Sequence, residues 1–346
     1  MKKTFKKIIG KNIKPFIIAE ISANHNGNLD QAKKLISAAK KAGADAVKIQ
    51  TYEPESMTIN SNKEDFKIKH GIWKGKKLYN LYKLAQTPFS WHKELFNQAK
   101  KNKILIFSTP FDFKAVDLLE SLKVPFYKIA SFEITDHPLI EYIAEKKKPI
   151  FLSTGMANKG EIKEALKIIK SKGVKDILLF HCISSYPSKV EEYNLNMIKT
   201  LAKDFNTHVG LSDHTTGNEA ALASIALGAV AIEKHFKLES SNDSPDSKFS
   251  IDPVYMKNLV SQSKNLWKGL GGGNYERAKE EKQNLIFRRS LYFVRDLKKG
   301  ERISKDNIKS LRPSFGLQPK HLKKVLGKKV KSDVKSGDRV TWQVVK

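Results

Sequence analysis

The chain has 346 residues, of which 40% are hydrophobic, and a formal net charge of +28. This length predicts one large domain and a small one, with enough apolar residues for a buried core. The longest near-continuous apolar stretch, 221–232, is much shorter than the ~20 residues of a membrane-spanning helix. Lysines and Pro15 interrupt the segment where a signal peptide would need its apolar core. Cys182 is the single cysteine, which excludes an intramolecular disulfide, so we expect a protein of the reducing cytoplasm with no membrane partner.

The basic excess is almost entirely lysine, because only seven of the 64 basic residues are arginines. The lysines are scattered along helical faces and form no stripe with interleaved aromatic residues, so we expect a solvated surface and no nucleic-acid partner. All seven arginines lie at or after Arg277. Where lysine is the default cation, an arginine suggests a need for its planar, bidentate guanidinium.

From residue 16 to residue 268, short runs of β-forming residues alternate with segments of helical periodicity such as 29–43, 160–173 and 253–268. The predicted strands are 16–22, 46–52, 104–110, 126–131, 149–155, 177–184, 208–213 and 231–236. Eight strands alternating with helices over about 250 residues are typical of a (β/α)8 TIM barrel, an α/β fold. An open, doubly wound sheet is the alternative, but no glycine-rich phosphate turn follows the first strand.

Two regions depart from this alternation. A longer segment, 53–90, follows the second predicted strand and carries Trp73, and we expect it to form a lid or a dimer surface. The second region begins where the barrel pattern stops. We predict a barrel domain over 1–268, a linker over 269–286 and a small domain over 287–346. In the small domain, the similar phrases DLKKGERIS and DVKSGDRVT each suggest a glycine turn between short strands.

Polar side chains stand at the carboxyl ends of the predicted strands, where barrels of this type carry their catalytic groups. In chain order they are Glu20, Ser22, Lys48, Gln50, Ser108, Thr109, Lys128, Ser131, Glu133, Ser153, Thr154, Ser184, Tyr186, Ser212, Asp213, His214, Lys234 and His235. A ring of such groups above an apolar barrel predicts a binding site for a small polar ligand.

Two histidines and two lysines of this ring suggest specific chemistry. His214 and His235 follow consecutive strands, so their imidazoles can converge on one Mn²⁺, Co²⁺ or Zn²⁺ ion. Lys48 and Lys128 lie within β runs, where an unpaired cation would be costly, and predict a cradle for a phosphate and a carboxylate. Cys182 directly follows a histidine, but neighbours on a strand point to opposite faces, so we expect no nucleophilic pair and an inert thiol.

The same positions fall within a series of short motifs that spans essentially the whole chain. The motifs are AEISANHNG (19–27), KIQTY (48–52), FSTPFD (107–112), KIASFE (128–133), STGMA (153–157), SSYP (184–187), GLSDHT (210–215), EKHF (233–236), PDSKFSIDP (245–253), FRRSLY (287–292) and LRPSFGL (311–317). In this order they resemble the sialic acid synthase family, and most closely its pseudaminic acid synthase branch. The resemblance implies a TIM barrel followed by an antifreeze-protein-like (SAF) domain, in a homodimer whose small domains are swapped over the partner barrels.

The resemblance also implies a reaction and a set of roles. The reaction is the metal-dependent condensation of phosphoenolpyruvate with an open-chain acetamido sugar, here 2,4-diacetamido-2,4,6-trideoxy-L-altrose, giving pseudaminic acid and phosphate. The implied phosphoenolpyruvate ligands are Lys48, Thr109, Lys128, Ser131, Ser153 and Ser212. The implied ligands of the metal, Mn²⁺ before Mg²⁺ or Co²⁺, are His214 and His235. The implied catalytic residues are Glu20, Lys48, Glu133 and Asp246, and the implied sugar ligands are Gln50, Tyr186, Asp246 and Arg312 of the neighbouring subunit.

Other functions remain open at this point. N-acetylneuraminate and legionaminate synthases would share the metal and phosphoenolpyruvate residues and differ only near the sugar. A carbohydrate-binding protein without catalysis is an alternative of another class, but a pure binder has no use for both histidines. Ser247 and Phe249 favour the pseudaminic acid branch, because they predict an apolar wall that would accept a methyl group better than a hydroxymethyl group.

Overall fold

The computed structural model describes residues 2–238 and 244–346. The chain divides into two compact units, Met1–Gly271 and Gly272–Lys346. Within the described residues, no helix combines the length and the apolar character needed to cross a bilayer.

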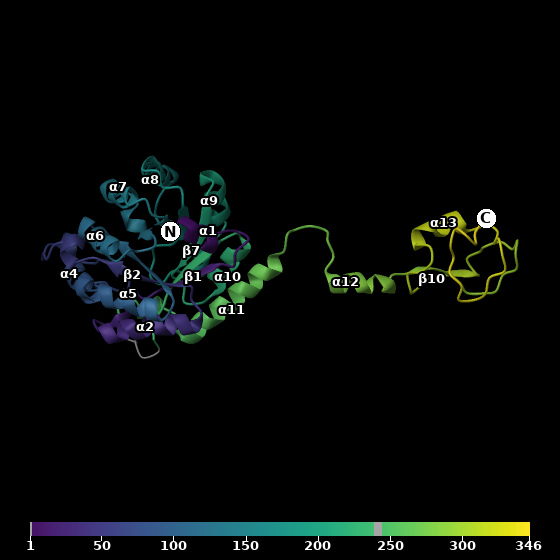
Figure 1. Ribbon diagram of the computed structural model, residues 1–346, viewed down its shortest axis with the longest axis horizontal. Helices are drawn as coiled ribbons and strands as arrows, with labels where there is room; N and C mark the ends of the chain where they lie inside the picture. The colour runs from purple at the N-terminus through teal and green to yellow at the C-terminus, as the bar shows by residue number, and fades with distance from the viewer. Residues whose placement is uncertain (1, 239–243) are drawn as a thin grey trace. The chain divides into compact units, whose positions relative to one another are not determined.

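The first unit is a closed barrel of eight parallel strands in the order β1 to β8, which confirms the predicted TIM barrel (Figure 1). The strands are β1 (Phe16–Glu20), β2 (Ala46–Thr51), β3 (Leu105–Pro110), β4 (Tyr127–Ile129), β5 (Ile150–Ser153), β6 (Ile177–Cys182), β7 (His208–Asp213) and β8 (Ala231–His235). Pairing of β1 with β8, from Phe16 opposite Ala231 to Glu20 opposite His235, closes the ring. Several predicted strands end earlier than expected, because their last polar residues form short 3-10 turns at Ser22–His25 and Ser131–Glu133.

Helices surround the barrel, and several of them begin at side chains that accept hydrogen bonds from their first free N–H groups. The principal ones are α2 (Leu29–Ala42), α5 (His92–Lys101), α6 (Phe113–Ser121), α7 (His137–Glu145), α8 (Lys159–Ser171), α9 (Met197–Phe205), α10 (Glu219–Ala226) and α11 (Pro253–Leu270). Asn28 caps α2, Asn158 forms a capping box with Glu161 at α8, and Asp252 caps α11 ahead of a proline at its first position.

The amino end of the barrel is filled by aromatic side chains. The rings of Phe107 and Phe151 each lie close to Phe126, with centroids 4.5 Å apart in both pairs, and Phe180 lies 5.6 Å from Phe151. A short helix that the sequence did not predict, α1 (Lys2–Ile8), adds Phe5 to this cluster at 6.1 Å from Phe151. This packing leaves the carboxyl end as the place for polar groups.

A buried ion pair joins β7 to β8 behind the barrel wall. Asp213 and Lys234 are opposite each other in the register, both side chains are fully buried, and Lys234 Nζ lies 2.7 Å from Asp213 Oδ2. The same ammonium donates to the carbonyls of Thr215 (2.7 Å) and Gly217. Because each member of the pair directly precedes a histidine, the pair fixes the strand ends that carry His214 and His235.

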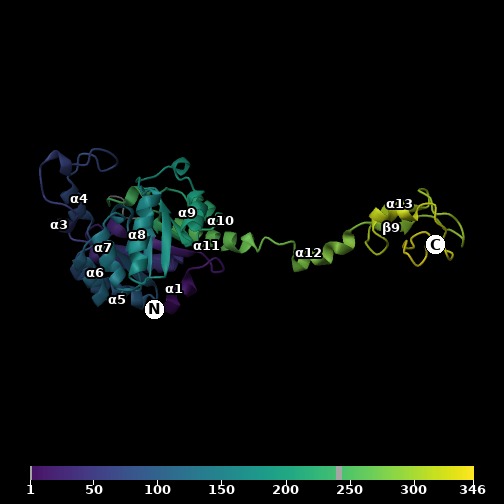
Figure 2. The same cartoon turned by 90° about the horizontal axis from the view of Figure 1, so that it is seen from above.

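The segment 53–90 leaves the barrel after β2 and contains α3 (Pro54–Met57) and α4 (Leu78–Ala85). In Figure 2 these helices and the loop between them extend away from the strands. Within that loop, residues 67–77 form a hairpin-like turn, with the N–H of Ile68 donating to Lys76 O (2.9 Å) and that of Gly75 donating to Ile68 O (2.8 Å).

The second unit has its own small core, formed by Leu291, Phe293, Val340 and their neighbours. Its antiparallel pair is β9 (Ser290–Phe293) and β10 (Ile308–Leu311), and a short helix, α12 (Lys279–Gln283), precedes it. The prediction of short strands around the two glycine turns was wrong. The two segments pair only through isolated bridges such as Leu297 with Val334. In each tight turn a side-chain carboxylate accepts a hydrogen bond from a backbone N–H that a strand ladder would need, Glu301 from Lys298 and Asp338 from Lys335.

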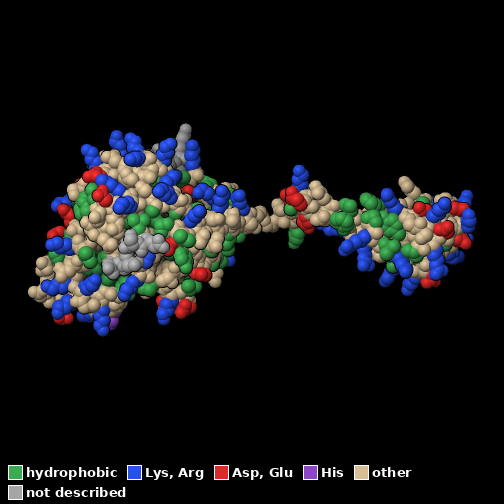
Figure 3. Space-filling model, turned by 90° about the horizontal axis from the view of Figure 1, so that it is seen from below, with side chains coloured by type: hydrophobic (Ala, Val, Ile, Leu, Met, Phe, Trp, Pro, Cys, Tyr) green, Lys and Arg blue, Asp and Glu red, His purple; other side chains and the backbone are tan. Residues whose placement is uncertain are grey.

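Basic side chains are dispersed over the face of the molecule shown in Figure 3, with acidic and uncharged groups between them. No continuous basic stripe crosses that face. This distribution agrees with a solvated lysine-rich surface.

The Asp213–Lys234 pair leads to a prediction about stability. Lys234→Met should lower the free energy of unfolding of the barrel by about 3–5 kcal/mol, because it leaves the Asp213 carboxylate buried without its partner. Chemical denaturation followed by circular dichroism measures this change. Lys172→Met is the matched control, since Lys172 pairs with Glu141 and Glu145 at the surface and its loss should hardly move the unfolding midpoint. Equal midpoints for the two variants would contradict the prediction.

Candidate active site

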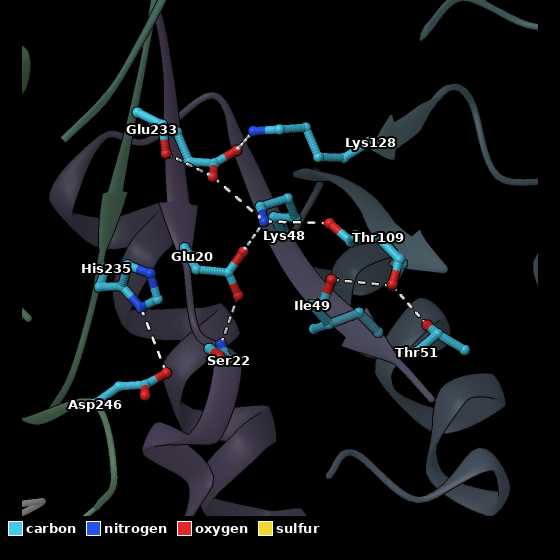
Figure 4. Close-up of polar contacts among 12 residues, drawn as sticks. Glu20, Ser22, Lys48, Ile49, Thr51, Thr109, Lys128, Glu233, His235 and Asp246 are labelled. Carbon is cyan, nitrogen blue, oxygen red and sulfur yellow. Dashed lines mark hydrogen bonds and ion pairs between the residues drawn. The ribbon is translucent and has the colours of Figure 1, made fainter. Parts of the chain in front are cut away.

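Two lysines and two glutamates form a buried network at the carboxyl end of the barrel (Figure 4). Lys48 Nζ lies 2.5 Å from Glu20 Oε2 and 3.3 Å from Glu233 Oε1, and it donates to Thr109 Oγ1 at 3.3 Å. Lys128 Nζ lies 2.7 Å from Glu233 Oε2. These side chains come from β1, β2, β4 and β8, so the closed sheet holds them at fixed distances.

Glu233 is a member of this network that the sequence analysis missed. Its carboxylate bridges the two lysines and also accepts a hydrogen bond from Ser212 Oγ at 3.2 Å. A signal was present, because Glu233 precedes His235 by two residues and alternate residues of a strand share a face.

Burial and charge act against each other on these groups. Burial alone would lower the pKa of Lys48, but the carboxylates of Glu20 and Glu233 outweigh it and raise that pKa. Burial also opposes ionisation of Glu233, yet Lys128 and Lys48 hold its pKa at about 2. For Glu20 burial prevails and raises the pKa, and for Lys128 burial prevails and lowers it. The Lys48 ammonium and the Glu233 carboxylate are therefore the most firmly charged groups of the site.

Hydroxyl and backbone groups line the space beside the lysines. Ser131 Oγ accepts a hydrogen bond from Gly155 N at 3.2 Å, and Ser153 is buried at the end of β5. A Cβ at Gly155 would lie 2.5 Å from Ser184 Oγ, so only glycine allows the backbone this approach. Ser184 Oγ is buried without a hydrogen-bond partner and is a free donor. Together with Thr109, these groups suit the oxygens of an anion.

The two predicted histidines do converge. Their ring centroids are 5.5 Å apart. His214 Nδ1 lies 2.8 Å from the carbonyl of Ile183, and because a carbonyl only accepts, Nδ1 carries the hydrogen and Nε2 keeps its lone pair. His235 Nδ1 is buried, makes no hydrogen bond and lies 3.5 Å from Asp246 Oδ2. This donor set fits a divalent cation, although no group of three or more His, Cys, Asp or Glu side chains in the described residues has the arrangement of a metal site.

Cys182 lies beside this pair. Its Sγ is 3.9 Å from His214 Nδ1, whereas the His181 ring turns away, with Nε2 2.6 Å from the carbonyl of Tyr193. The two neighbours therefore point apart as predicted, and the buried thiol belongs to the wall of the site.

Asn24 connects the first and last strands above the site. Its Nδ2 donates to the carbonyl of Phe236 at 2.9 Å and to Ser250 Oγ at 2.8 Å, and its Oδ1 accepts from Ser244 Oγ. Ser250 in turn donates to the carbonyl of Asp246 at 2.6 Å. Asn24, which the sequence analysis did not single out, thus positions the loop that carries Asp246.

Aromatic side chains form the wall next to the histidines. The Tyr186 ring lies 4.3 Å from the ring of His214, and the Phe249 ring lies 4.8 Å from that of His235. Tyr186 and Phe249 also contact each other, with centroids 5.1 Å apart. Phe249 therefore does line the site, as the apolar-wall argument requires.

The remaining predicted residues lie at different places. Gln50 follows Lys48 by two residues on β2 and is half-buried. Glu133 lies in the turn after β4, with Oε2 buried and without a hydrogen-bond partner. Burial raises the pKa of Glu133 to about 7. Arg312 belongs to the second unit, where its side chain is exposed just after β10.

The arrangement of lysines, hydroxyls and paired histidines at one barrel mouth agrees with what known proteins show. Residues 35–275 match the model of the NeuB family, and residues 288–346 match the SAF domain. The chain belongs to the NeuB family.

Among relatives, a pseudaminic acid synthase of Campylobacter jejuni is 48% identical over 94% of this chain and 95% of its own length. An N,N'-diacetyllegionaminic acid synthase of the same organism is 41% identical over 91% of this chain and 95% of its own length. The solved structure of an N-acetylneuraminic acid synthetase from Leptospira borgpetersenii is similar with a TM-score of 0.71, at 34% identity over 80% of this chain and 91% of that protein. Each of these three proteins aligns with at least 80% of this chain.

Glu133 provides a pH prediction. The pKa of Glu133 is 4.5 in the unfolded chain and about 7 in the folded protein. Between these pH values the unfolded chain has already released this proton while the folded protein still holds it, so the free energy of unfolding falls as the pH increases. Glu133→Gln cannot titrate, so the variant should gain stability relative to the unmodified protein over this interval. Unfolding midpoints measured across the interval test this. The control is Glu145→Gln, since the hydrogen bond from Lys172 lowers the pKa of Glu145 and its titration lies at lower pH. If the difference in unfolding midpoint between Glu133→Gln and the unmodified protein stays constant across this pH interval, the raised pKa of Glu133 is refuted.

Proposed function

We propose that this chain condenses phosphoenolpyruvate with 2,4-diacetamido-2,4,6-trideoxy-L-altrose, giving pseudaminic acid and inorganic phosphate. It is then a transferase of carbohydrate biosynthesis, acting in the cytoplasm. The observation that carries the proposal is the buried Lys48–Glu233–Lys128 network beside the His214–His235 pair, because one mouth offers both an anion site and a site for a carbonyl oxygen. The 48% identity to a pseudaminic acid synthase over 94% of the chain supports the choice of product.

Phosphoenolpyruvate would bind where the lysines now pair with glutamates. Its phosphate and carboxylate would accept from Lys48 and Lys128 and from the hydroxyls around them. The proposed ligands are Lys48, Thr109, Lys128, Ser131, Ser153 and Ser212. All of these are buried, so water is largely excluded and each charge-assisted hydrogen bond is strong.

His214 and His235 would hold a divalent cation, with Mn²⁺ favoured over Mg²⁺ or Co²⁺. The free Nε2 of His214 and the Nδ1 of His235, which makes no hydrogen bond and lies 3.5 Å from the Asp246 carboxylate, support this assignment, and two imidazoles leave positions open for substrate or water. When bound, the cation would act as a Lewis acid on the aldehyde oxygen of the sugar.

The chain's own residues would then guide the bond changes. The vinyl carbon of phosphoenolpyruvate attacks the aldehyde carbon, and the carbonyl π electrons move to the oxygen, which takes a proton and becomes a hydroxyl. This forms a carbon–carbon bond and leaves positive charge at the former enol carbon. Water adds to that carbon and loses a proton, and the intermediate then breaks its carbon–oxygen bond to phosphate while its new hydroxyl loses a proton, which leaves a ketone. Glu20 and Glu233 lie close enough to the lysines to stabilise this charge, and Glu20 and Glu133, whose pKa values are raised, are suited to accept the proton of water. Gln50, Tyr186 and Asp246 would contact the sugar.

Arg312 would reach the acetamido group of the sugar from a neighbouring subunit, in a homodimer with swapped SAF domains. Two observations support this proposal. Arg312 is exposed and has no hydrogen-bond or ion-pair partner in the described part of the chain. The loops that follow β3, β4 and β5 leave Phe113, Phe132 and Met156 50%, 59% and 63% exposed around the mouth, an apolar rim that a partner's domain would cover.

The sugar preference tests the function directly. Phosphate release should require phosphoenolpyruvate and an acetamido sugar, with kcat/KM roughly ten- to hundredfold higher for the diacetamido trideoxy sugar than for N-acetylmannosamine. The reason is that the aromatic wall to which Phe249 belongs offers a hydroxymethyl group no hydrogen-bond partner, which costs about 1–3 kcal/mol. Preference for N-acetylmannosamine would contradict the product assignment but not the reaction class. No phosphate release with any acetamido sugar would contradict both.

The metal assignment gives a second test. His214→Ala and His235→Ala should abolish turnover and weaken Mn²⁺ binding in a calorimetric titration, while the circular dichroism spectrum stays unchanged. His208→Ala is the matched control, because His208 begins β7 at the other end of the same strand as His214 and should leave both properties intact. Full activity of metal-stripped enzyme in excess chelator would refute the assignment.

The proposed role of Arg312 is tested by mixing inactive subunits. Arg312→Lys should lose most activity, because the ammonium of lysine cannot replace the planar guanidinium with its paired N–H donors. Arg302→Lys, in the same unit, should keep its activity. Arg312→Ala and His235→Ala subunits should partly restore activity when mixed, since one intact site forms in each mixed dimer. Mixed dimers that form and stay inactive would exclude a contribution from the partner.

A further inference from the structure

The segment 53–90 brings the side chain of Trp73 to the aromatic wall of the site. Trp73 is at the tip of the hairpin-like turn 67–77, which is closed by a bridge between Lys67 and Lys77. The indole Nε1 donates to the carbonyl of Pro245 at 3.1 Å, in the loop after β8. Residues separated by 172 positions are thereby joined, and Pro245 directly precedes Asp246.

The indole ring continues the aromatic wall of the site. Its centroid lies 5.9 Å from that of Tyr186 and 6.1 Å from that of Phe249. Those two rings contact His214 and His235 respectively. Two paths of touching rings therefore lead from the histidine pair to Trp73, which is the outermost member of both.

This geometry places Trp73 at a definite part of the acceptor. An open-chain hexose whose aldehyde carbon lies at the histidine pair must extend its chain away from them, because the lysine network and the phosphoenolpyruvate site occupy the other side. The terminal carbon, C6, then lies along the outer part of the aromatic wall.

We propose that Trp73 forms the outer wall of the acceptor subsite and that the hairpin 67–77 selects a sugar whose terminal carbon is a methyl group. This inference rests on the function proposed above for the identity of the acceptor. Its physical basis is that indole Nε1 is a donor only and is already used by Pro245, so the ring offers a hydroxymethyl group no partner. A methyl group needs none and packs against the ring face.

The test compares three variants with two sugars that differ in the terminal group, a 6-deoxy acetamido sugar and its 6-hydroxy counterpart. Trp73→Ala should lower kcat/KM for the 6-deoxy sugar about tenfold or more, mainly through KM, and bring the ratio for the two sugars towards one, with KM for phosphoenolpyruvate unchanged. Trp73→Phe keeps a ring and should retain most of the preference. Trp267→Ala is the matched control, because Trp267 is also half-buried and donates Nε1 to a carbonyl at 3.1 Å, that of Lys11.

The ratio is the decisive quantity. If Trp73→Ala slows both sugars equally, or if Trp267→Ala changes the ratio as much, Trp73 has only a structural role and the inference is wrong. A ratio that stays unchanged in Trp73→Ala also overturns it.

A binding measurement separates this inference from the proposed reaction. Tryptophan emission is followed while the 6-deoxy sugar is added with Mn²⁺ and without phosphoenolpyruvate, for the unmodified protein, Trp73→Phe and Trp267→Phe. A signal lost only in Trp73→Phe, in a protein that releases no phosphate, supports the subsite and contradicts the reaction. Phosphate release with a preference independent of Trp73 supports the reaction and contradicts the subsite. A protein that neither responds to the sugar nor releases phosphate contradicts both.

Discussion

The shared Glu233 carboxylate is the interaction on which the site depends. It lies between Lys48 and Lys128, and without it Lys128 would lose its carboxylate partner and only Glu20 would balance the two ammonium groups inside the closed barrel. Such a charge pair is tolerable only when anions lie beside it, and Glu20 and Glu233 supply them here.

Around this centre the barrel separates three tasks. The aromatic cluster at the amino end supplies packing, the lysines and hydroxyls form the proposed anion site, and the histidines lie against the rings of Tyr186 and Phe249, where we propose that the sugar binds. Buried polar residues that touch no ligand position the rest. Asn24 fixes the loop of Asp246, and the Asp213–Lys234 pair fixes the strand ends before both histidines.

The sequence predicted the barrel well, because each strand is a short β-rich run followed by a turn and a helix with clear periodicity. It also predicted that polar strand-end groups would meet at the mouth, since parallel strands end on the same side, but Asp213 and Lys234 of the predicted ring instead pair with each other behind the barrel wall. Glu233 was missed because it lies inside a strand run, before the polar end. Trp73 could not be placed, because its contact with Pro245 depends on two loops far apart in sequence and on no local pattern. The strands of the second unit were over-predicted, because tight turns there use the backbone groups that a ladder would need.

The closure of β1 against β8 has a consequence for biosynthesis. Glu20 on β1 lies opposite His235 on β8 in the strand register, and the side chain of Asn24 donates a hydrogen bond to that of Ser250, 226 positions later in the chain. On the ribosome, the first strand can pair with β2 early, but its second partner, β8, exists only after about two-thirds of the chain has emerged. The catalytic mouth is among the last parts to assemble, because loop closure over so long a distance is slow. Until then, β1 presents an unpaired strand edge, the kind of edge that promotes aggregation.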